Sequence, residues 1–68
     1  MDRRQVEARY LAGYADGRTA CLRASSSDVA QRWIKENQNA DPAYLAGYEW
    51  AVWDYEDANG VARRTGTV

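Results

Sequence analysis

The chain has 68 residues, 46% of them hydrophobic, and a formal net charge of −1. One cysteine and no histidine exclude an intrachain disulfide and a zinc site built from the usual ligands. The near-zero net charge excludes long-range attraction of the whole chain to nucleic acid.

The first predicted helix spans about residues 2–24, because proline is absent from it and glycine and β-branched residues are sparse. Asp16-Gly17 is also a turn signal, so the alternative is a helix that divides at this point. The serines at 25–27 end the helix and supply capping oxygens for the next one.

A second, short helix is predicted over about residues 28–38, where Asp28 and Gln31 have the spacing of a capping box. The third helix begins with Asp41 as N-cap and Pro42 as its first residue, a strong start signal. It continues to about Ala58, because the Asn-Gly pair at 59–60 is a typical helix stop.

These signals predict an all-α chain with long first and third helices and a short second helix. Residues 1–60 are expected to form a single domain and residues 61–68 a flexible tail, because the tail has nothing to bury. A chain this short buries only about 60% of the surface that it exposes when unfolded. Its stability is therefore expected to be marginal without a partner or a covalent cross-link.

The five-residue stretch Tyr-Leu-Ala-Gly-Tyr occurs twice, at 10–14 and 44–48. On a helical wheel both copies fall in the apolar arc of their helix. A glycine inside a helix costs about 1 kcal/mol relative to alanine, which is explained if its missing side chain lets another backbone approach. The repeat therefore predicts that the first and third helices pack face to face, within one chain or across a dimer. The residues expected in this contact are Tyr10, Gly13, Tyr14, Gly17, Tyr44, Gly47, Tyr48 and Ala51.

Two other interpretations of the repeat remain open. The tyrosines at 10, 14, 44 and 48 could line a ligand groove, although aromatic stripes at helical spacing more often belong to the core. The spacing of the copies, with Asp-Pro before the second, also resembles a tetratricopeptide-like helix pair. Arg18 and Asn37 stand where that family has small residues, and fewer than two units fit.

The stretch YLAGYADG at 10–17, and in part YLAGYEWA at 44–51, resembles small helical proteins of unknown function from actinobacterial tailed phages. Short Y-x-x-G-Y-x-x-G stretches recur in those proteins. Ala51 departs from the pattern, because the second glycine would stand there. The resemblance implies an accessory protein that acts in a bacterial cytoplasm by binding a host protein, and it implies no catalytic residue.

The third helix has a second distinctive face, opposite the tyrosine stripe, where Trp50 and Trp53 lie three residues apart among carboxylates. Exposed indoles inside a charged rim are typical of a protein-binding patch. The alternative is that the second helix covers them, through Trp33 and Ile34, as a second core layer. The candidate partner-binding residues are Trp50, Trp53, Glu49, Asp54, Glu56 and Asp57, with Trp50 as the expected anchor.

Charge is unevenly distributed along the chain. Residues 1–35 carry seven Arg or Lys against four acids, whereas residues 36–60 carry six acids and no base. The arginines of the first helix, with Arg63 and Arg64, could bind nucleic acid, but their wheel angles scatter. The acidic third helix could instead mimic DNA at a basic site of another protein.

No catalytic residue, metal site or cofactor is predicted, since no histidine is present to act as a base and Cys21 falls on the apolar arc. A magnesium site made of Asp54 and Asp57 alone is the weak alternative. No apolar run is as long as the roughly 20 residues that a membrane-spanning helix needs. An unpaired cysteine is consistent with a reducing compartment. We therefore expect a cytoplasmic protein, in the host cytoplasm if the chain is viral.

The sequence as a whole predicts a non-enzymatic protein–protein interaction module. Its partner is another protein, such as a bacterial host protein, or a second copy of itself in a homo-oligomer. The alternatives are a small nucleic-acid-binding protein and a structural subunit of a larger assembly.

Overall fold

The structure is a computed structural model that describes residues 2–60. This part of the chain consists of three helices and the segments that connect them. They are α1 (Arg3–Ala24), α2 (Asp28–Glu36) and α3 (Pro42–Ala58), and residues 2–60 contain no β-strand. The predicted all-α fold with two long helices and one short helix is confirmed. The predicted tail, with its two arginines, lies outside the described residues. Within residues 2–60, no helix has the length and apolar character needed to cross a membrane.

Helix α1 is continuous through Asp16-Gly17, so the alternative of a break at this pair is wrong. The helix begins with a capping box that the sequence analysis missed: the Asp2 carboxylate accepts from Arg4 N–H, and the Gln5 side chain accepts from Asp2 N–H. It ends at Ser25, which adopts a left-handed conformation with φ of 53°.

Helix α2 begins at Asp28 as predicted, but its N-terminal cap and its end differ from the prediction. Asp28 is already helical, and its N–H donates to the Ser26 hydroxyl, so the predicted capping box of Asp28 and Gln31 does not form. The helix ends at Glu36, two residues before the predicted end, because Asn37 leaves the helical region at φ −124°. The Asn37 and Gln38 amides then donate to the last backbone carbonyls of the helix.

Helix α3 has the predicted ends. The Asp41 carboxylate accepts from Tyr44 N–H, and Pro42 opens the helix, where its missing N–H removes no bond. After Ala58 the chain turns through Asn59 and through Gly60, whose φ of 70° suits glycine.

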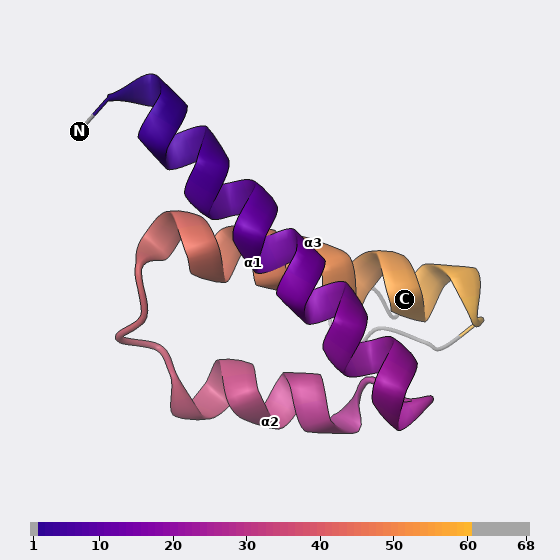
Figure 1. Cartoon of the computed structure of the whole chain (residues 1–68). Helices are drawn as coiled ribbons and strands as arrows, with labels where there is room; N and C mark the ends of the chain where they lie inside the picture. Colours follow the sequence, from indigo (N-terminus) through magenta and orange to yellow (C-terminus); the bar gives the residue numbers. More distant parts are fainter. Residues whose placement is uncertain (1, 61–68) are drawn as a thin grey trace, which may run out of the picture.

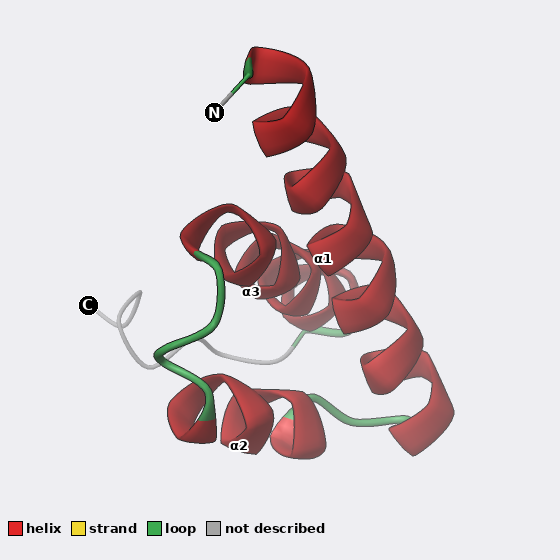
Figure 2. Ribbon diagram, turned by 60° about the vertical axis from the view of Figure 1, so that its left-hand side comes forward, coloured by secondary structure: helices red, strands yellow, loops and turns green. Residues whose placement is uncertain are grey.

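Helices α1 and α3 cross near their middles, and α2 packs to one side of the crossing (Figure 1). Figure 2 shows α2 beneath the α1–α3 pair, joined to each by a short loop. The first turns of α1 project beyond α3 (Figure 1), which leaves Val6 42% exposed although the helical wheel turns it toward α3.

The hydrophobic core lies where α2 meets the other two helices. The Trp33 ring stacks on Tyr48 with centroids 4.3 Å apart and meets Tyr44 edge-on at 6.0 Å. The aromatic layer that α2 covers is therefore made by these tyrosines and not by Trp50 and Trp53. The buried residues of the core are Cys21, Ala30, Ile34, Tyr48 and Val52.

Candidate functional site

The two copies of Tyr-Leu-Ala-Gly-Tyr meet at the crossing of α1 and α3. A Cβ added to Gly13 would lie 2.8 Å from the carbonyl carbon of Tyr44 and closer still to its oxygen. A Cβ added to Gly47 would stand in the same relation to the Tyr10 carbonyl. Gly13 therefore accommodates the backbone of Tyr44, and Gly47 accommodates the backbone of Tyr10. In each case the accommodated tyrosine lies three residues before the other glycine. This reciprocal contact explains why the stretch is repeated.

The same contact continues one turn further along both helices. A Cβ on Gly17 would lie 2.7 Å from the Tyr48 carbonyl oxygen and 3.1 Å from the Ala51 Cβ. Gly13, Gly17 and Gly47 are all buried, so this surface is used inside one chain and is not free to bind a second copy.

Polar side chains link the two helices beside the glycine contact. The Tyr14 hydroxyl donates to the Asp54 carboxylate at 2.6 Å, and the Tyr44 hydroxyl donates to Asp16. Arg9 forms an ion pair with Asp41 at 2.9 Å. Hydrogen bonds to the Tyr44 backbone and the Arg9 guanidinium hold the pKa of the Asp41 carboxyl below its usual value.

The tyrosines do not line a common groove, so that alternative is wrong. Tyr44 and Tyr48 turn toward Trp33 of α2, whereas Tyr14 bonds Asp54 of α3. Burial raises the pKa of the Tyr48 hydroxyl, and the bond to Asp54 raises that of the Tyr14 hydroxyl.

Tyr44 is expected to ionise later than an ordinary tyrosine. Burial and the bond to Asp16 raise its pKa from 10.0 to about 12. Between these values the unfolded chain loses the Tyr44 proton first, so the stability that this proton provides is complete below pH 10 and falls as pH rises toward 12. Alkaline titration of phenolate absorbance should show a late step that Tyr44→Phe removes. A titration with the same late step in the variant would contradict this assignment.

Trp50 is the exposed aromatic residue of α3. It is 47% exposed and lies outside the core, and its ring meets Trp53 edge-on with centroids 5.4 Å apart. Trp53 is half-buried, and Trp33 and Ile34 of α2 pack elsewhere. The alternative that α2 covers both indoles as a second core layer is therefore wrong.

The acidic residues near the two indoles are of different kinds. Glu49 is half-buried, and Asp54 and Asp57 are exposed. Glu56, by contrast, is only 6% exposed and accepts from the Gln31 amide of α2 at 3.1 Å. Its assignment to the partner-binding rim is wrong, because α2 covers this side of α3. We call the remaining set, Glu49, Trp50, Trp53, Asp54 and Asp57, the tryptophan face.

A groove of about 260 Å³ opens between α1 and α3. Most of its lining was not predicted, because a groove between crossing helices depends on where they diverge, and the sequence of a single helix carries no signal for that. The lining residues are Tyr14, Arg18, Leu22, Ala51, Asp54, Tyr55, Ala58 and Asn59. Asp54 is the one residue that belongs to both this groove and the tryptophan face.

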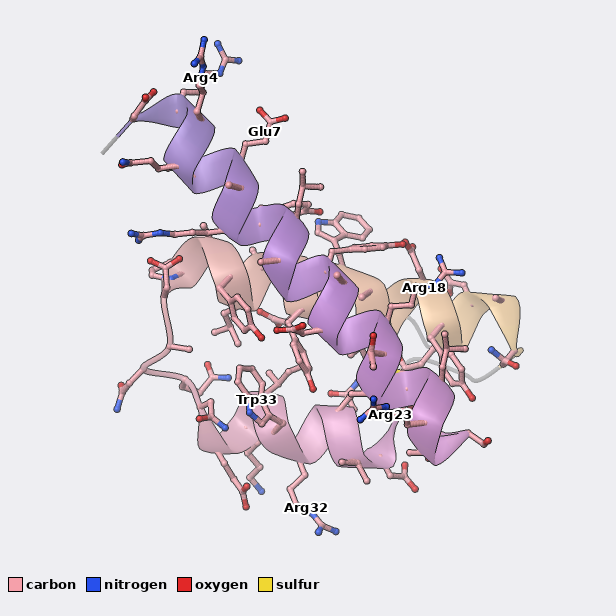
Figure 3. The ribbon with its side chains drawn as sticks, viewed as in Figure 1. Arg4, Glu7, Arg18, Arg23, Arg32 and Trp33 are labelled. Carbon is pink, nitrogen blue, oxygen red and sulfur yellow. The ribbon has the colours of Figure 1, made fainter. Side chains whose placement is uncertain are left out.

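Within residues 2–60, the remaining reactive or charged groups form no site. Cys21 is buried, and burial, followed by the nearby Glu56 charge, raises the pKa of its thiol. Among residues 2–60, no three Cys, Asp or Glu side chains come close enough to hold a metal ion. Figure 3 shows Arg4 at the outer end of α1, Arg18 farther along that helix, and Arg32 on the outer side of α2. Arginines so dispersed do not form the one-sided patch that nucleic-acid binding requires.

Comparison of the chain with protein-family models, with curated proteins and with solved structures finds no match. Residues 10–17, which carry the resemblance to phage proteins, lie in the helix contact at Gly13 and Gly17. They bear on the fold, and the function has to be inferred from the surfaces that the fold leaves exposed.

Proposed function

We propose that the protein is a non-enzymatic module that binds another protein through the tryptophan face. The observation that carries this proposal is the half-exposed indole of Trp50 beside Trp53, on the helix that supplies much of the core. Tryptophans at interfaces account for much of the binding energy because they bury a large apolar area when a partner excludes water.

The charges around the indoles define the kind of partner. Glu49, Asp54 and Asp57 each lie within four residues of one of the two indoles along α3, and residues 36–60 contain no Lys or Arg. A second copy placed symmetrically on this face would bring like charges together, which is unfavourable. A protein with an apolar pocket and a basic rim fits better. The bacterial host protein implied by the resemblance to phage proteins is one candidate.

Replacing both indoles, Trp50→Ser with Trp53→Ser, is expected to weaken partner binding at least tenfold, since hot-spot residues contribute about 2 kcal/mol or more. The bait is the full chain in lysate of its source or host, followed by titration calorimetry with the purified partner. The matched control is Val29→Ser, which removes another exposed apolar side chain, on α2, that is 56% exposed. Circular dichroism must show that each variant is folded.

Each outcome separates the candidate functions. Equal retention of a protein by wild type and double variant contradicts the tryptophan face as the site. Retention of nucleic acid, with binding that weakens steeply as salt rises, favours the nucleic-acid alternative. Wild-type association with itself that the double variant loses favours the structural subunit.

A further inference from the structure

The groove between α1 and α3 has the size and the walls to hold one long side chain. Its volume of about 260 Å³ is near the lower limit of about 300 Å³ for sites of drug-sized ligands. The aromatic residues Tyr14 and Tyr55 line the groove, together with the apolar residues Leu22, Ala51 and Ala58. Such walls suit the aliphatic stem of a side chain and a flat group that stacks on an aromatic ring.

Two features of the groove favour a positive charge. The Asp54 carboxylate lines it, and only one of its oxygens accepts the Tyr14 hydroxyl; the other accepts no hydrogen bond from residues 2–60. Ala58 and Asn59 place the C-terminal end of α3 there, and the last turn of α3 has no basic residue. Helix C-termini attract cations because their carbonyl groups carry partial negative charge.

Among the described residues that line the groove, Arg18 is the one cation, and its charge opposes another cation. Within residues 2–60, Arg18 forms no ion pair, and it is exposed, so its long stem lets the guanidinium turn toward water. An anionic ligand would instead need Arg18. Its substitution therefore distinguishes the two ligand charges.

We propose that this groove receives an arginine side chain of the protein partner, with its guanidinium between the tyrosine rings and the Asp54 carboxylate. The planar guanidinium stacks on aromatic rings and bonds carboxylates, whereas a lysine ammonium only does the second well. This assignment rests on the proposed function for the source of the arginine, and it adds the side chain that the partner must present beside its tryptophan pocket.

The test is a titration of the full chain with N-acetyl-arginine methylamide, followed by nuclear magnetic resonance. N-acetyl-norleucine methylamide, with a neutral stem of similar length, is the control ligand. Saturable shifts are expected for the arginine compound alone, confined to residues that line the groove. Asp54→Asn keeps an acceptor for Tyr14 and should weaken binding about fivefold, and Arg18→Gln should strengthen it by about twofold to fivefold.

The proposal is overturned if no saturable shift occurs, if norleucine gives the same shifts, or if Arg18→Gln weakens binding. Trp50 does not line the groove, so Trp50→Ser should leave the titration unchanged. If the groove binds the arginine compound but partner binding does not depend on the tryptophans, only the tryptophan face is contradicted. Partner binding that depends on Trp50, in a chain that does not bind the arginine compound, would contradict only the groove.

Discussion

Gly13→Ala and Gly47→Ala are each expected to destabilise the protein strongly, by about 3 kcal/mol or more. Each new methyl group would overlap a backbone carbonyl of the facing helix, and the backbone cannot move aside as the end of a flexible side chain can. The helices would have to separate along the contact that holds the fold together. Overpacking of this kind costs about 1–3 kcal/mol and more where backbone must move, and a domain of this length has about 3–10 kcal/mol in total.

The sign of the change in stability distinguishes the helix contact from intrinsic helix propensity. In an isolated helix the same substitutions would stabilise by about 1 kcal/mol. Gly17→Ala is expected to cost less, because its new methyl group meets the Tyr48 carbonyl oxygen at 2.7 Å. The matched controls are Ala12→Leu and Ala46→Leu, which add volume at exposed neighbouring positions and should change stability by about 0.5 kcal/mol or less. Urea unfolding followed by circular dichroism measures all five; a stabilised Gly13→Ala would contradict the observed crossing.

Tyr48→Ala is expected to destabilise the chain by about 3–5 kcal/mol, as large aromatic-to-alanine changes in cores do. Tyr48 is 5% exposed, and its ring stacks on Trp33, the main aromatic contact between α3 and α2. Loss of the ring leaves Trp33 with its edge-on contact to Tyr44 as its remaining aromatic contact among residues 2–60. The measurement is the free energy of unfolding, with near-ultraviolet dichroism to follow the environment of Trp33.

Tyr48→Phe is the matched control, since it keeps the ring and removes only the hydroxyl. Its cost should stay near 1 kcal/mol or below. If Tyr48→Phe and Tyr48→Ala proved equally destabilising, the stacked ring would not be the source of the stability.

The division of α3 into faces links the fold to the proposed function. One side of the helix receives α1 at Gly47 and Ala51, and another receives α2 at Tyr48, Val52 and Glu56. The third side carries Trp50 and remains exposed. A helix with two packed faces is held rigidly, so indoles on its third face are already oriented for a partner and lose little conformational freedom on binding.

The helices and their main contact could be predicted from patterns of neighbouring residues. Helix ends depend on neighbouring residues, so the Asp41-Pro42 start and the Asn59-Gly60 stop predicted α3 correctly. The end of α2 was misplaced because the Asn37 and Gln38 side chains compete for its last carbonyls. The repeated Tyr-Leu-Ala-Gly-Tyr predicted the contact because an interior glycine is unfavourable unless another backbone occupies its place.

What lies beside that contact depends on how the three helices pack against one another. Helical periodicity places Glu56 near the tryptophans, but the position of α2 buries it against Gln31. Periodicity also groups the four tyrosines, although their rings turn toward different neighbours. The groove with Arg18 and Leu22 exists because α1 and α3 diverge beyond their crossing. These features depend on how α1 and α3 cross and on where α2 lies. Contacts between residues distant in sequence fix both, and no pattern within one helix encodes them.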